Sequence, residues 1–516
     1  SLKSSPDMIR KSHTGPIPPV ISLIVVVLAG AALGLCLPKP GLTAFAWCAP
    51  AILLRRLRVS RSPLASFGLG WAFGAAFCGV ALHWIYLTCR FAGLSVPVSA
   101  AAAAGLCALL GLNWGVFAFF SRVFIDRLPG WTLPWALAAL LAAIESACAA
   151  WTPRLGFDLL AYTQWPNLFL LQGSAVFGPH ALGFLILLWN ACWESFLRDR
   201  AKTARINLGL CALLLAAWAS YGTFILSKRE IVPGHIVEII QPNIDQYRKW
   251  DADSAPDIRR TIEGLMARER KDAPALILWP ESSVPGWLDD PENSRWAASL
   301  ARQAKAPVLL GAVTRMGSRE HNSAVLFSAE GRPEALYNKR QLVPFGEFVP
   351  LRTWLQGAVP LLGGMWDMEP GQAAQTLMAT PLGPLAVNIC YESVFPRWVR
   401  LDASRGARVA ANLTNDGWYK DTWGPLQHFQ VNVFRAIENR ITVLRAGNTG
   451  VSAVIDPYGR VLARGPFLAP ARLEARLNDE GAFPKGSFYS RHGDWFGFLC
   501  IAFVPALVVI LSRKPA

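Results

Sequence analysis

The sequence predicts a multi-pass α-helical membrane domain joined to an α/β domain. Hydrophobic residues make up 53% of the 516 residues and charged residues only 16%, whereas a soluble protein of this size has about 25% charged residues. The apolar excess fills 1–227 and about the last twenty residues, while 228–494 contains polar and charged residues throughout. We therefore expect an N-terminal membrane domain at 1–227, an α/β domain at 228–494, and a C-terminal transmembrane helix with a short tail at 495–516.

Seven apolar segments before residue 228 are candidate transmembrane helices, and an eighth follows the α/β domain. A helix needs about 20 apolar residues to cross a bilayer, with a range of about 17–25. The shortest candidate is the second. In chain order the segments are 18–37, 41–54, 64–88, 92–121, 132–151, 174–197, 206–227 and 495–512.

The charges of the loops predict the orientation of these helices. Lys and Arg gather at both termini and in alternate loops, at 55–61, 122–127 and 198–205. The intervening loops hold only Lys39, Arg90 and Arg154. The positive-inside rule therefore places both termini in the cytoplasm. Seven crossings then place the α/β domain outside, which for the inner membrane of a Gram-negative cell is the periplasm.

Two features of the helical part have alternative interpretations. The first span has the length of a signal peptide, but no A-x-A cleavage site follows it. Glu145 lies inside an apolar span, where a carboxylate is either a functional group or a helix-packing contact.

The remaining composition limits the classes of function. The net charge is +15, but the basic residues follow the membrane topology and form no basic-aromatic recognition module, so we expect no nucleic acid partner. Nine of the ten cysteines lie in or beside apolar segments, where Cys behaves as a small hydrophobe. Only Cys390 lies in the α/β domain, so a chemical role is expected for it. No His, Cys and Asp cluster has ligand spacing, and neither a metal nor an organic cofactor is predicted.

Strand-like runs alternate with helical ones in the second domain. The strand-like runs are 235–241, 275–279, 307–310, 385–390, 409–413 and 442–445. The helical runs are 254–271 and 293–305. Further strand-like runs at 321–327, 451–456 and 460–463 have no helix beside them, which predicts mixed sheets. Strands separated by helices indicate a layered α/β fold.

Three chemically capable residues stand near strand ends in this domain. Glu281 and Cys390 each follow a buried run, and Lys339 lies between them in the sequence. Separately, they have ordinary explanations as a solvated Glu, a buried Cys and a surface Lys. Together, a thiolate nucleophile, an ammonium that favours thiolate and stabilises an oxyanion, and a carboxylate base form a catalytic set. A Cys-His protease site with His428 or His321 is the competing arrangement, although neither His has a protease-like setting.

The sequence around these residues resembles a known superfamily. Trp279-Pro280-Glu281-Ser282, Asn338-Lys339-Arg340 and Ile389-Cys390-Tyr391-Glu392 resemble the three catalytic motifs of the nitrilase superfamily. Further matching stretches lie at 241–243 with Trp250, 342–350, 412–418 and 445–450. With seven spans before this domain and one after it, nearly the whole chain resembles the apolipoprotein N-acyltransferases, which are membrane-embedded members of that superfamily.

This resemblance implies an αββα sandwich and a reaction in two steps. Cys390 would attack an acyl ester of a membrane phospholipid, with Glu281 as general base, and would hold the acyl chain as a thioester. Lys339, helped by a backbone N–H near Tyr391, would stabilise the oxyanion. The α-amino group of an S-diacylglyceryl-cysteine at a lipoprotein N-terminus would then accept the acyl chain.

The resemblance also implies four supporting residues: Trp250, Glu347, Tyr391 and Glu392. Glu347 would orient Lys339 or a proton, whereas Tyr391 and Glu392 are either part of the site or structural supports. Arg340 is expected to be dispensable.

Three hypotheses follow for the whole chain. The first is apolipoprotein N-acyltransfer. The second is a membrane-anchored amidase acting on a small soluble substrate, for which one anchor would suffice. The third is a non-enzymatic scaffold. The segment 351–368, which is rich in Trp and Leu but interrupted by Pro and Gly, is interpreted as a lid that dips into the membrane surface or as a core-packing loop.

Overall fold

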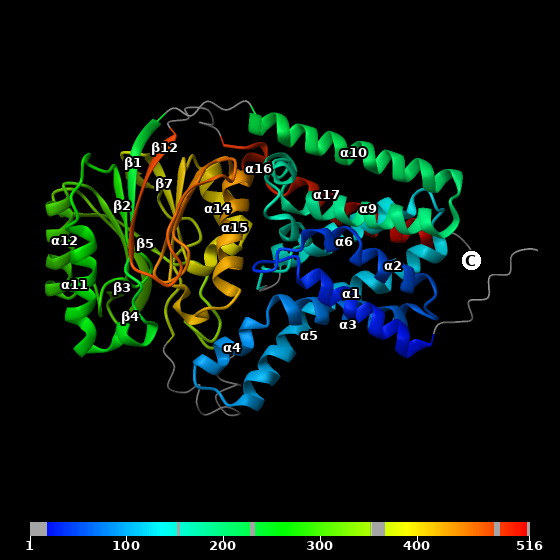
Figure 1. The fold of residues 1–516 in the computed structure, drawn as a ribbon, viewed down its shortest axis with the longest axis horizontal. Helices are drawn as coiled ribbons and strands as arrows, with labels where there is room; N and C mark the ends of the chain where they lie inside the picture. Colours follow the sequence, from blue (N-terminus) through cyan, green and yellow to red (C-terminus); the bar gives the residue numbers. More distant parts are fainter. Residues whose placement is uncertain are drawn as a thin grey trace, which may run out of the picture.

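The computed structural model describes residues 18–151, 155–227, 233–350, 352, 367–478 and 486–512. An all-helical part precedes a two-sheet domain, and a last helix returns to the helical part (Figure 1). The helices of the helical part are α1 (Pro19–Gly34), α2 (Ala49–Arg58), α3 (Pro63–Ala81), α4 (Trp84–Phe91), α5 (Val96–Arg127), α6 (Leu133–Trp151), α7 (Leu168–Leu171), α8 (Ser174–Phe177), α9 (Pro179–Asp199), α10 (Lys202–Ser227), α16 (Phe488–His492) and α17 (Trp495–Ser512).

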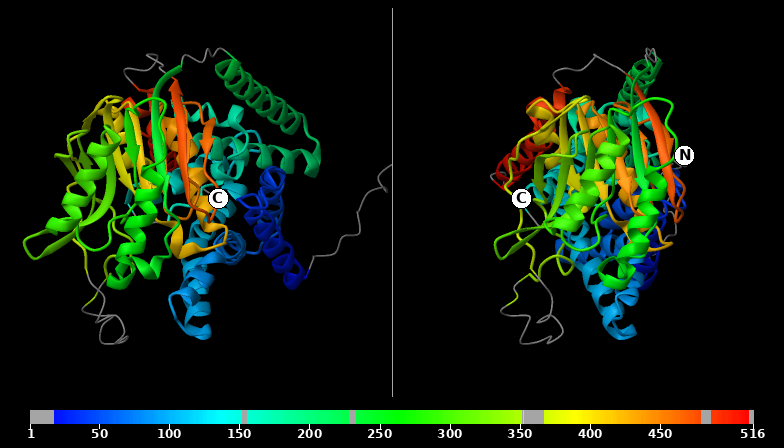
Figure 2. Two further views of the ribbon diagram at one scale, coloured as in Figure 1. Left: turned by 60° about the vertical axis from the view of Figure 1, so that its left-hand side comes forward. Right: turned by 90° about the vertical axis from the view of Figure 1, so that its left-hand side faces the viewer.

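Five of these helices, α3, α5, α6, α9 and α10, are long and apolar enough to cross a membrane, which indicates a membrane protein. The helices α1 and α17 are apolar but shorter. Figure 2 shows α10 set apart from the other long helices, and most of its side chains are exposed. An apolar helix with exposed side chains is suited to contact with lipid.

The predicted span at 41–54 is wrong as a continuous helix. The segment forms a short 3₁₀ turn, Thr43–Trp47, followed by α2 with only ten residues. At about 1.5 Å per residue, α2 is about 15 Å long, half the thickness of the hydrocarbon core. The backbone of Cys48 between the two pieces is not helical.

Two other predicted spans are interrupted. The span at 64–88 breaks after Ala81, and the side chain of Gln427 from the second domain donates to the Ala81 carbonyl at 2.7 Å. This contact satisfies a carbonyl that the helix end leaves free. The span at 174–197 is divided by Gly178, whose φ of +79° is in the left-handed region that glycine adopts without strain.

The span predicted at 92–121 is the 32-residue α5, about 48 Å long and therefore longer than a bilayer core is thick. Its second half packs closely on α3. A Cβ atom on Gly70 would lie 2.2 Å from the Trp114 carbonyl oxygen. Close backbone approach at small residues is typical of packing between membrane helices.

The second domain contains two six-stranded mixed sheets. The first sheet has the order β12 (Ala471–Asn478), β1 (Pro233–Gln241), β2 (Leu276–Leu278), β3 (Val308–Met316), β4 (Arg319–Phe327) and β5 (Pro333–Asn338). The second has the order β11 (Val461–Arg464), β10 (Ala453–Ile455), β9 (Thr442–Gly447), β8 (Val409–Thr414), β7 (Gly383–Ile389) and β6 (Met378–Thr380). The central strands of each sheet, β1 to β3 and β7 to β9, are parallel.

Four helices complete an αββα sandwich, and this confirms the predicted fold class. Figure 1 shows α11 and α12 on the outer side of the first sheet, and α14 and α15 between the second sheet and the helical part. The sequence missed β5, β6, β12, α14 and α15. The helices are α11 (Ala255–Met266), α12 (Pro291–Ala304), α14 (Pro396–Ser404) and α15 (Gly424–Asn439).

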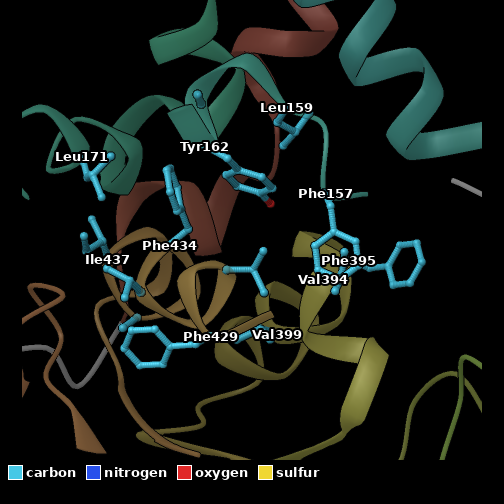
Figure 3. Close-up of a cluster of buried hydrophobic side chains, with 14 of the residues drawn as sticks. Phe157, Leu159, Tyr162, Leu171, Val394, Phe395, Val399, Phe429, Phe434 and Ile437 are labelled. Carbon is cyan, nitrogen blue, oxygen red and sulfur yellow. The ribbon is translucent and has the colours of Figure 1, made fainter. Parts of the chain in front are cut away.

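A buried apolar cluster joins the two parts of the chain. Figure 3 shows side chains of the 155–171 segment packed against α14, α15 and the turn before α14. All of them belong to one continuous hydrophobic core. They are Phe157, Leu159, Tyr162 and Leu171 on one side, and Val394, Phe395, Val399, Phe429, Phe434 and Ile437 on the other.

Glu145 in α6 contributes to the same region. Its Oε1 accepts the backbone N–H of Leu160 at 3.0 Å. This bond positions the 155–171 segment, and it supports the packing interpretation of this intramembrane carboxylate.

Candidate active site

Strand direction brings Glu281, Lys339 and Cys390 together. Glu281 follows β2 and Cys390 follows β7, each at the carboxyl end of a strand. Lys339 follows β5, which runs in the same direction as β2 because two antiparallel pairings separate it from β3. Functional sites are common at such strand ends in α/β sheets. Here the strand ends of the two sheets face each other.

The Lys339 ammonium lies between two carboxylates. Its Nζ donates to Glu281 Oε1 at 3.2 Å and to Glu347 Oε1 at 2.8 Å. The side chain is 1% exposed. Glu347 Oε2 accepts the N–H of Val343 at 2.7 Å. Glu347 therefore orients Lys339, one of the two roles considered for it.

Two asparagines that the sequence analysis did not single out complete this arrangement. The Nδ2 of Asn322 donates to Glu281 Oε1 and to Glu347 Oε1, each at 2.7 Å. The backbone N–H of Asn415 donates to Glu281 Oε2 at 2.9 Å. Asn322 lies in the polar first half of β4, where the sequence around it (Arg319-Glu320-His321-Asn322-Ser323) gives no signal of a special role. Asn415 lies within the 412–418 motif.

Cys390 is a buried thiol at a sharp turn. Its φ is +52°, a conformation that costs a non-glycine residue on the order of 1–3 kcal/mol and is frequent at functional sites. Burial, followed by the charge of Glu281, raises the pKa of Cys390 well above its ordinary value, while Lys339 acts in the opposite direction. Lys339 favours the thiolate, as the sequence predicted, but burial and Glu281 outweigh this effect, so the resting group is a thiol.

This raised pKa predicts the pH dependence of Cys390 alkylation. A higher pKa keeps the thiol protonated to higher pH, so the midpoint of the iodoacetamide reaction is expected well above the ordinary thiol value of about 8.5. Glu281→Gln removes a charge that raises this pKa and is expected to lower the midpoint. Mass spectrometry of the Cys390 peptide across a pH series measures both values. A wild-type midpoint at or below 8.5, or an unchanged midpoint in Glu281→Gln, would contradict this assignment.

A second buried lysine approaches Glu281 from the other side. The Nζ of Lys249 donates to the backbone carbonyl of Glu281 at 3.1 Å. Burial lowers the pKa of Lys249 to about 7, although the charges of Glu281 and Cys390 oppose the shift. Sequence analysis missed this residue. Its neighbour Trp250 ends a short 3₁₀ turn, and the side chain of Trp250 lies outside what the structure describes.

Glu392 connects the Cys390 turn to the Lys339 loop. Its carboxylate accepts the Tyr337 hydroxyl at 2.7 Å and the N–H of Ile389 at 2.7 Å. It also accepts the N–H of Gln341 at 3.0 Å and that of Arg340. These hydrogen bonds favour the structural-support interpretation of Glu392, one of the two alternatives for this residue.

Arg340 is buried, unlike an ordinary surface arginine. Its Nη2 donates to Asp402 Oδ2 at 2.8 Å, and its Nε donates to the Tyr337 hydroxyl at 2.8 Å. These contacts hold α14 against the loop that carries Lys339.

The two histidines do not form a Cys-His site. The ring of His428 contacts Asp416 at 2.8 Å and the backbone carbonyl of Cys390 at 3.0 Å. His321 Nδ1 contacts the carbonyl of Glu369 at 2.9 Å. Both rings are thus engaged with other groups, and the protease alternative lacks its base.

Aromatic rings from both parts of the chain lead to the nucleophile. Tyr391, the residue after Cys390, lies 6.4 Å between ring centroids from Phe157, and Phe157 lies 5.9 Å from Trp84 of α4. Trp84 is 4.8 Å from Tyr419. The buried apolar core of the helical part is therefore continuous with the residues around Cys390.

The described residues contain no group of three or more His, Cys, Asp and Glu side chains placed to hold a metal ion. The segment interpreted as a lid, 351–368, lies largely outside the described residues. At its two ends, Arg352 and Asp367 form a two-pronged ion pair with N–O distances of 2.6 and 2.7 Å.

Two family models match the two parts of this chain. The carbon-nitrogen hydrolase family model matches residues 237–472, and the model of the apolipoprotein N-acyltransferase N-terminal domain matches residues 29–192. Among solved structures, a mutant amidase from Nesterenkonia sp. AN1 aligns with 48% of this chain and 97% of its own, with 21% identity and a TM-score of 0.37.

Curated relatives cover almost the whole chain. The apolipoprotein N-acyltransferase of Geobacter metallireducens is 33% identical over 505 residues, 95% of each chain. That of Chlorobaculum tepidum is 28% identical and covers 95% of this chain and 96% of its own.

The fold and the matched domains define a membrane-bound acyltransferase with a carbon-nitrogen hydrolase domain. The chain belongs to the apolipoprotein N-acyltransferase family. Because its N-terminal helices match the N-terminal domain of that family, the finding favours acyl transfer over the amidase alternative.

Proposed function

We propose that this chain moves an acyl chain from a membrane phospholipid, through a thioester on Cys390, to the α-amino group of the N-terminal S-diacylglyceryl-cysteine of a lipoprotein. The observation that carries the proposal is the convergence of Glu281, Lys339 and Cys390 at facing strand ends, directly beside apolar helices. Family membership supports the acceptor, because the relatives are named for apolipoproteins.

In the first step, Glu281 takes the thiol proton as the sulfur of Cys390 attacks the ester carbonyl carbon. The Lys339 ammonium and the backbone N–H of Tyr391 stabilise the tetrahedral oxyanion. The carbon–oxygen ester bond then breaks, and the departing lysophospholipid oxygen takes the proton from Glu281.

The hydrogen bonds of Glu281 support its role as the base. An ionised carboxylate accepts about four hydrogen bonds. Three positions are taken, two on Oε1 by Lys339 and Asn322 and one on Oε2 by Asn415. Acceptor capacity therefore remains on Oε2 for the thiol proton.

In the second step, the neutral amine of the acceptor attacks the thioester carbonyl. Glu281 takes a proton from the attacking nitrogen, the carbon–sulfur bond breaks, and the Cys390 sulfur recovers that proton. The products are an amide and the resting thiol. Lys339 and the Tyr391 N–H stabilise the second oxyanion as they do the first.

The aromatic path supports a lipid acyl donor. A small-substrate amidase has no need of an apolar approach from a helical domain. Here Trp84, Phe157 and Tyr391 connect the membrane helices to the nucleophile, so that an acyl chain remains in apolar surroundings while its carbonyl reaches Cys390.

Detection of thioester-bound lipid tests the proposal. Purified full-length protein incubated with phospholipid and no acceptor is expected to gain one acyl mass on the Cys390 peptide, released by neutral hydroxylamine. Addition of a diacylated lipopeptide is expected to discharge it to an N-acylated product. An enzyme that transfers acyl chains without ever carrying one on Cys390 would rule out this mechanism.

The proposal includes the topology. We propose that the catalytic domain at 228–494 is periplasmic, that both termini are cytoplasmic, and that the domain boundaries are those inferred from the sequence. This topology requires seven crossings, so the turn Thr43–Trp47 and α2 together make the second crossing. A reporter active only after export and fused after residue 229 is expected to be active, whereas the same reporter fused after residue 200 is expected to be silent. The opposite pattern would contradict the orientation.

A further inference from the structure

Three side chains converge on the backbone carbonyl of Cys390. Asn412 Nδ2 lies 3.1 Å from this oxygen, His428 Nε2 lies 3.0 Å from it, and Ser393 Oγ lies 3.3 Å from it. All three side chains are buried. The carbonyl follows the end of β7, so side chains, and not a neighbouring strand, fix the orientation of this peptide.

The ring of His428 lies between Asp416 and the Cys390 carbonyl. Its Nδ1 lies 2.8 Å from Asp416 Oδ1, and its Nε2 faces the Cys390 carbonyl. A carbonyl oxygen only accepts, so the contact with Cys390 is a hydrogen bond when Nε2 carries the hydrogen. Ser393 Oγ also lies 3.2 Å from this Nε2.

Asp416 is held ionised by its surroundings. Although burial alone would raise its pKa, the charges of Arg445 and His428 hold the pKa of Asp416 below its ordinary value. The Thr414 hydroxyl donates to Asp416 Oδ1 at 3.1 Å, and Arg445 Nη2 donates to Oδ2. The carboxylate therefore fixes the ring from the side opposite Cys390.

We infer that His428, held by Asp416, is a positioning residue for the oxyanion donor: it polarises and orients the Cys390–Tyr391 peptide so that the Tyr391 N–H is a stronger and better-aligned donor to the reacting carbonyl. Donors on a peptide carbonyl withdraw electron density from the nitrogen of the same peptide, and linked hydrogen bonds strengthen one another by roughly 10–30% each. The inference rests on the proposed function, in which Cys390 carries a thioester.

The competing explanation is structural, since the same contacts also attach the Cys390 turn to α15. The two explanations predict different requirements for the side chain that replaces His428. A structural role depends on the size and packing of the side chain. A polarising role depends on an N–H aimed at the Cys390 carbonyl.

Methionine and glutamine at position 428 separate these roles, because they have nearly the same shape and only glutamine carries an N–H donor. The test uses full-length enzyme and a phospholipid labelled with ¹³C at the acyl carbonyl carbon. Single-turnover acylation gives rate and apparent affinity. Infrared difference spectra of the acyl-enzyme give the thioester carbonyl frequency, which is lower when the oxyanion donors bind it more strongly.

His428→Met is expected to slow acylation about tenfold, less than the 100–1,000-fold loss typical when an oxyanion donor is removed outright. Its carbonyl band is expected to move to higher frequency, with phospholipid KM unchanged. His428→Gln is expected to recover most of the rate and of the band position. Ser393→Ala, a smaller change that removes one donor from the same carbonyl, is expected to shift the band in the same direction by less.

Equal rates and identical bands in the Met and Gln variants, with a normal wild-type acyl-enzyme, would overturn this inference and leave the proposed function intact. If His428→Met does not fold, an unshifted thioester carbonyl band in Ser393→Ala would likewise overturn this inference. Absence of acyl-Cys390 in the unsubstituted enzyme would instead overturn the proposed function, and this inference with it.

Discussion

Cys390→Ala is expected to abolish acyl transfer, with a loss of at least about 10,000-fold in turnover, on the order seen when the nucleophile of a covalent catalyst is removed. The variant has no thiol at the strand end where Glu281 and Lys339 meet, so neither the acyl-enzyme nor the N-acylated product forms. Turnover is measured with phospholipid and diacylated lipopeptide, and acyl-enzyme formation by mass spectrometry of the 390 peptide.

Two further variants sharpen this test. Cys390→Ser is expected to fold and to bind phospholipid but to react poorly, because an alkoxide is much harder to form than a thiolate. Cys48→Ala replaces an exposed cysteine of the helical part and is expected to keep normal turnover. Appreciable transfer by Cys390→Ala would remove Cys390 from the mechanism.

Lys339→Met is the second substitution with a large expected effect, a loss of about 100–1,000-fold in the rate of acylation. The ammonium is the only cation in contact with both Glu281 and Glu347 among the described residues, and it faces the position of the oxyanion. Its removal also leaves two buried carboxylates without their counter-charge, which typically costs about 3–5 kcal/mol of stability.

Two measurements distinguish the loss of stability from the loss of catalysis in Lys339→Met. Thermal unfolding reports the loss of stability, and single-turnover acylation below the unfolding range reports the loss of chemistry. Lys305→Met makes the same change at an exposed lysine of the same domain and is expected to alter neither. Near-normal acylation by a folded Lys339→Met protein would show that the oxyanion has another partner.

The Asn338-Lys339-Arg340 motif does not by itself predict the structural role of Arg340. Its position beside Lys339 suggests a dispensable neighbour, and its side chain donates to Asp402 and Tyr337. The structure nevertheless buries it, so its replacement affects stability. The sequence alone does not show this burial, because burial of a charged side chain depends on partners far along the chain.

The ends of the membrane helices also could not be predicted from the sequence alone. Apolar runs located the helical part, but hydropathy does not resolve where one helix ends and the next begins. The break after Ala81 depends on Gln427, which lies 346 residues away. The 41–54 segment is apolar enough for a span, yet α2 has only half the required length.

Glu281, Lys339 and Cys390 were identified from the sequence because local motifs place each beside a strand end, and strand ends of common direction meet at one edge of the sheets. The supporting groups were not identifiable in this way. Asn322, Lys249 and the Asp416–His428 pair come from four separate elements, and their roles depend on hydrogen bonds across the sandwich.

The sequence by itself determined the division into apolar helices and an α/β domain, and the three chemical residues, because hydrophobic patterning and short motifs are properties of neighbouring residues. Only the tertiary structure decided the protonation of Cys390, the orientation of its peptide and the aromatic connection from Trp84 to Tyr391. Those properties depend on burial and on the directions of groups separated by tens to hundreds of residues. Such groups acquire a common environment only when the two sheets and the membrane helices pack together.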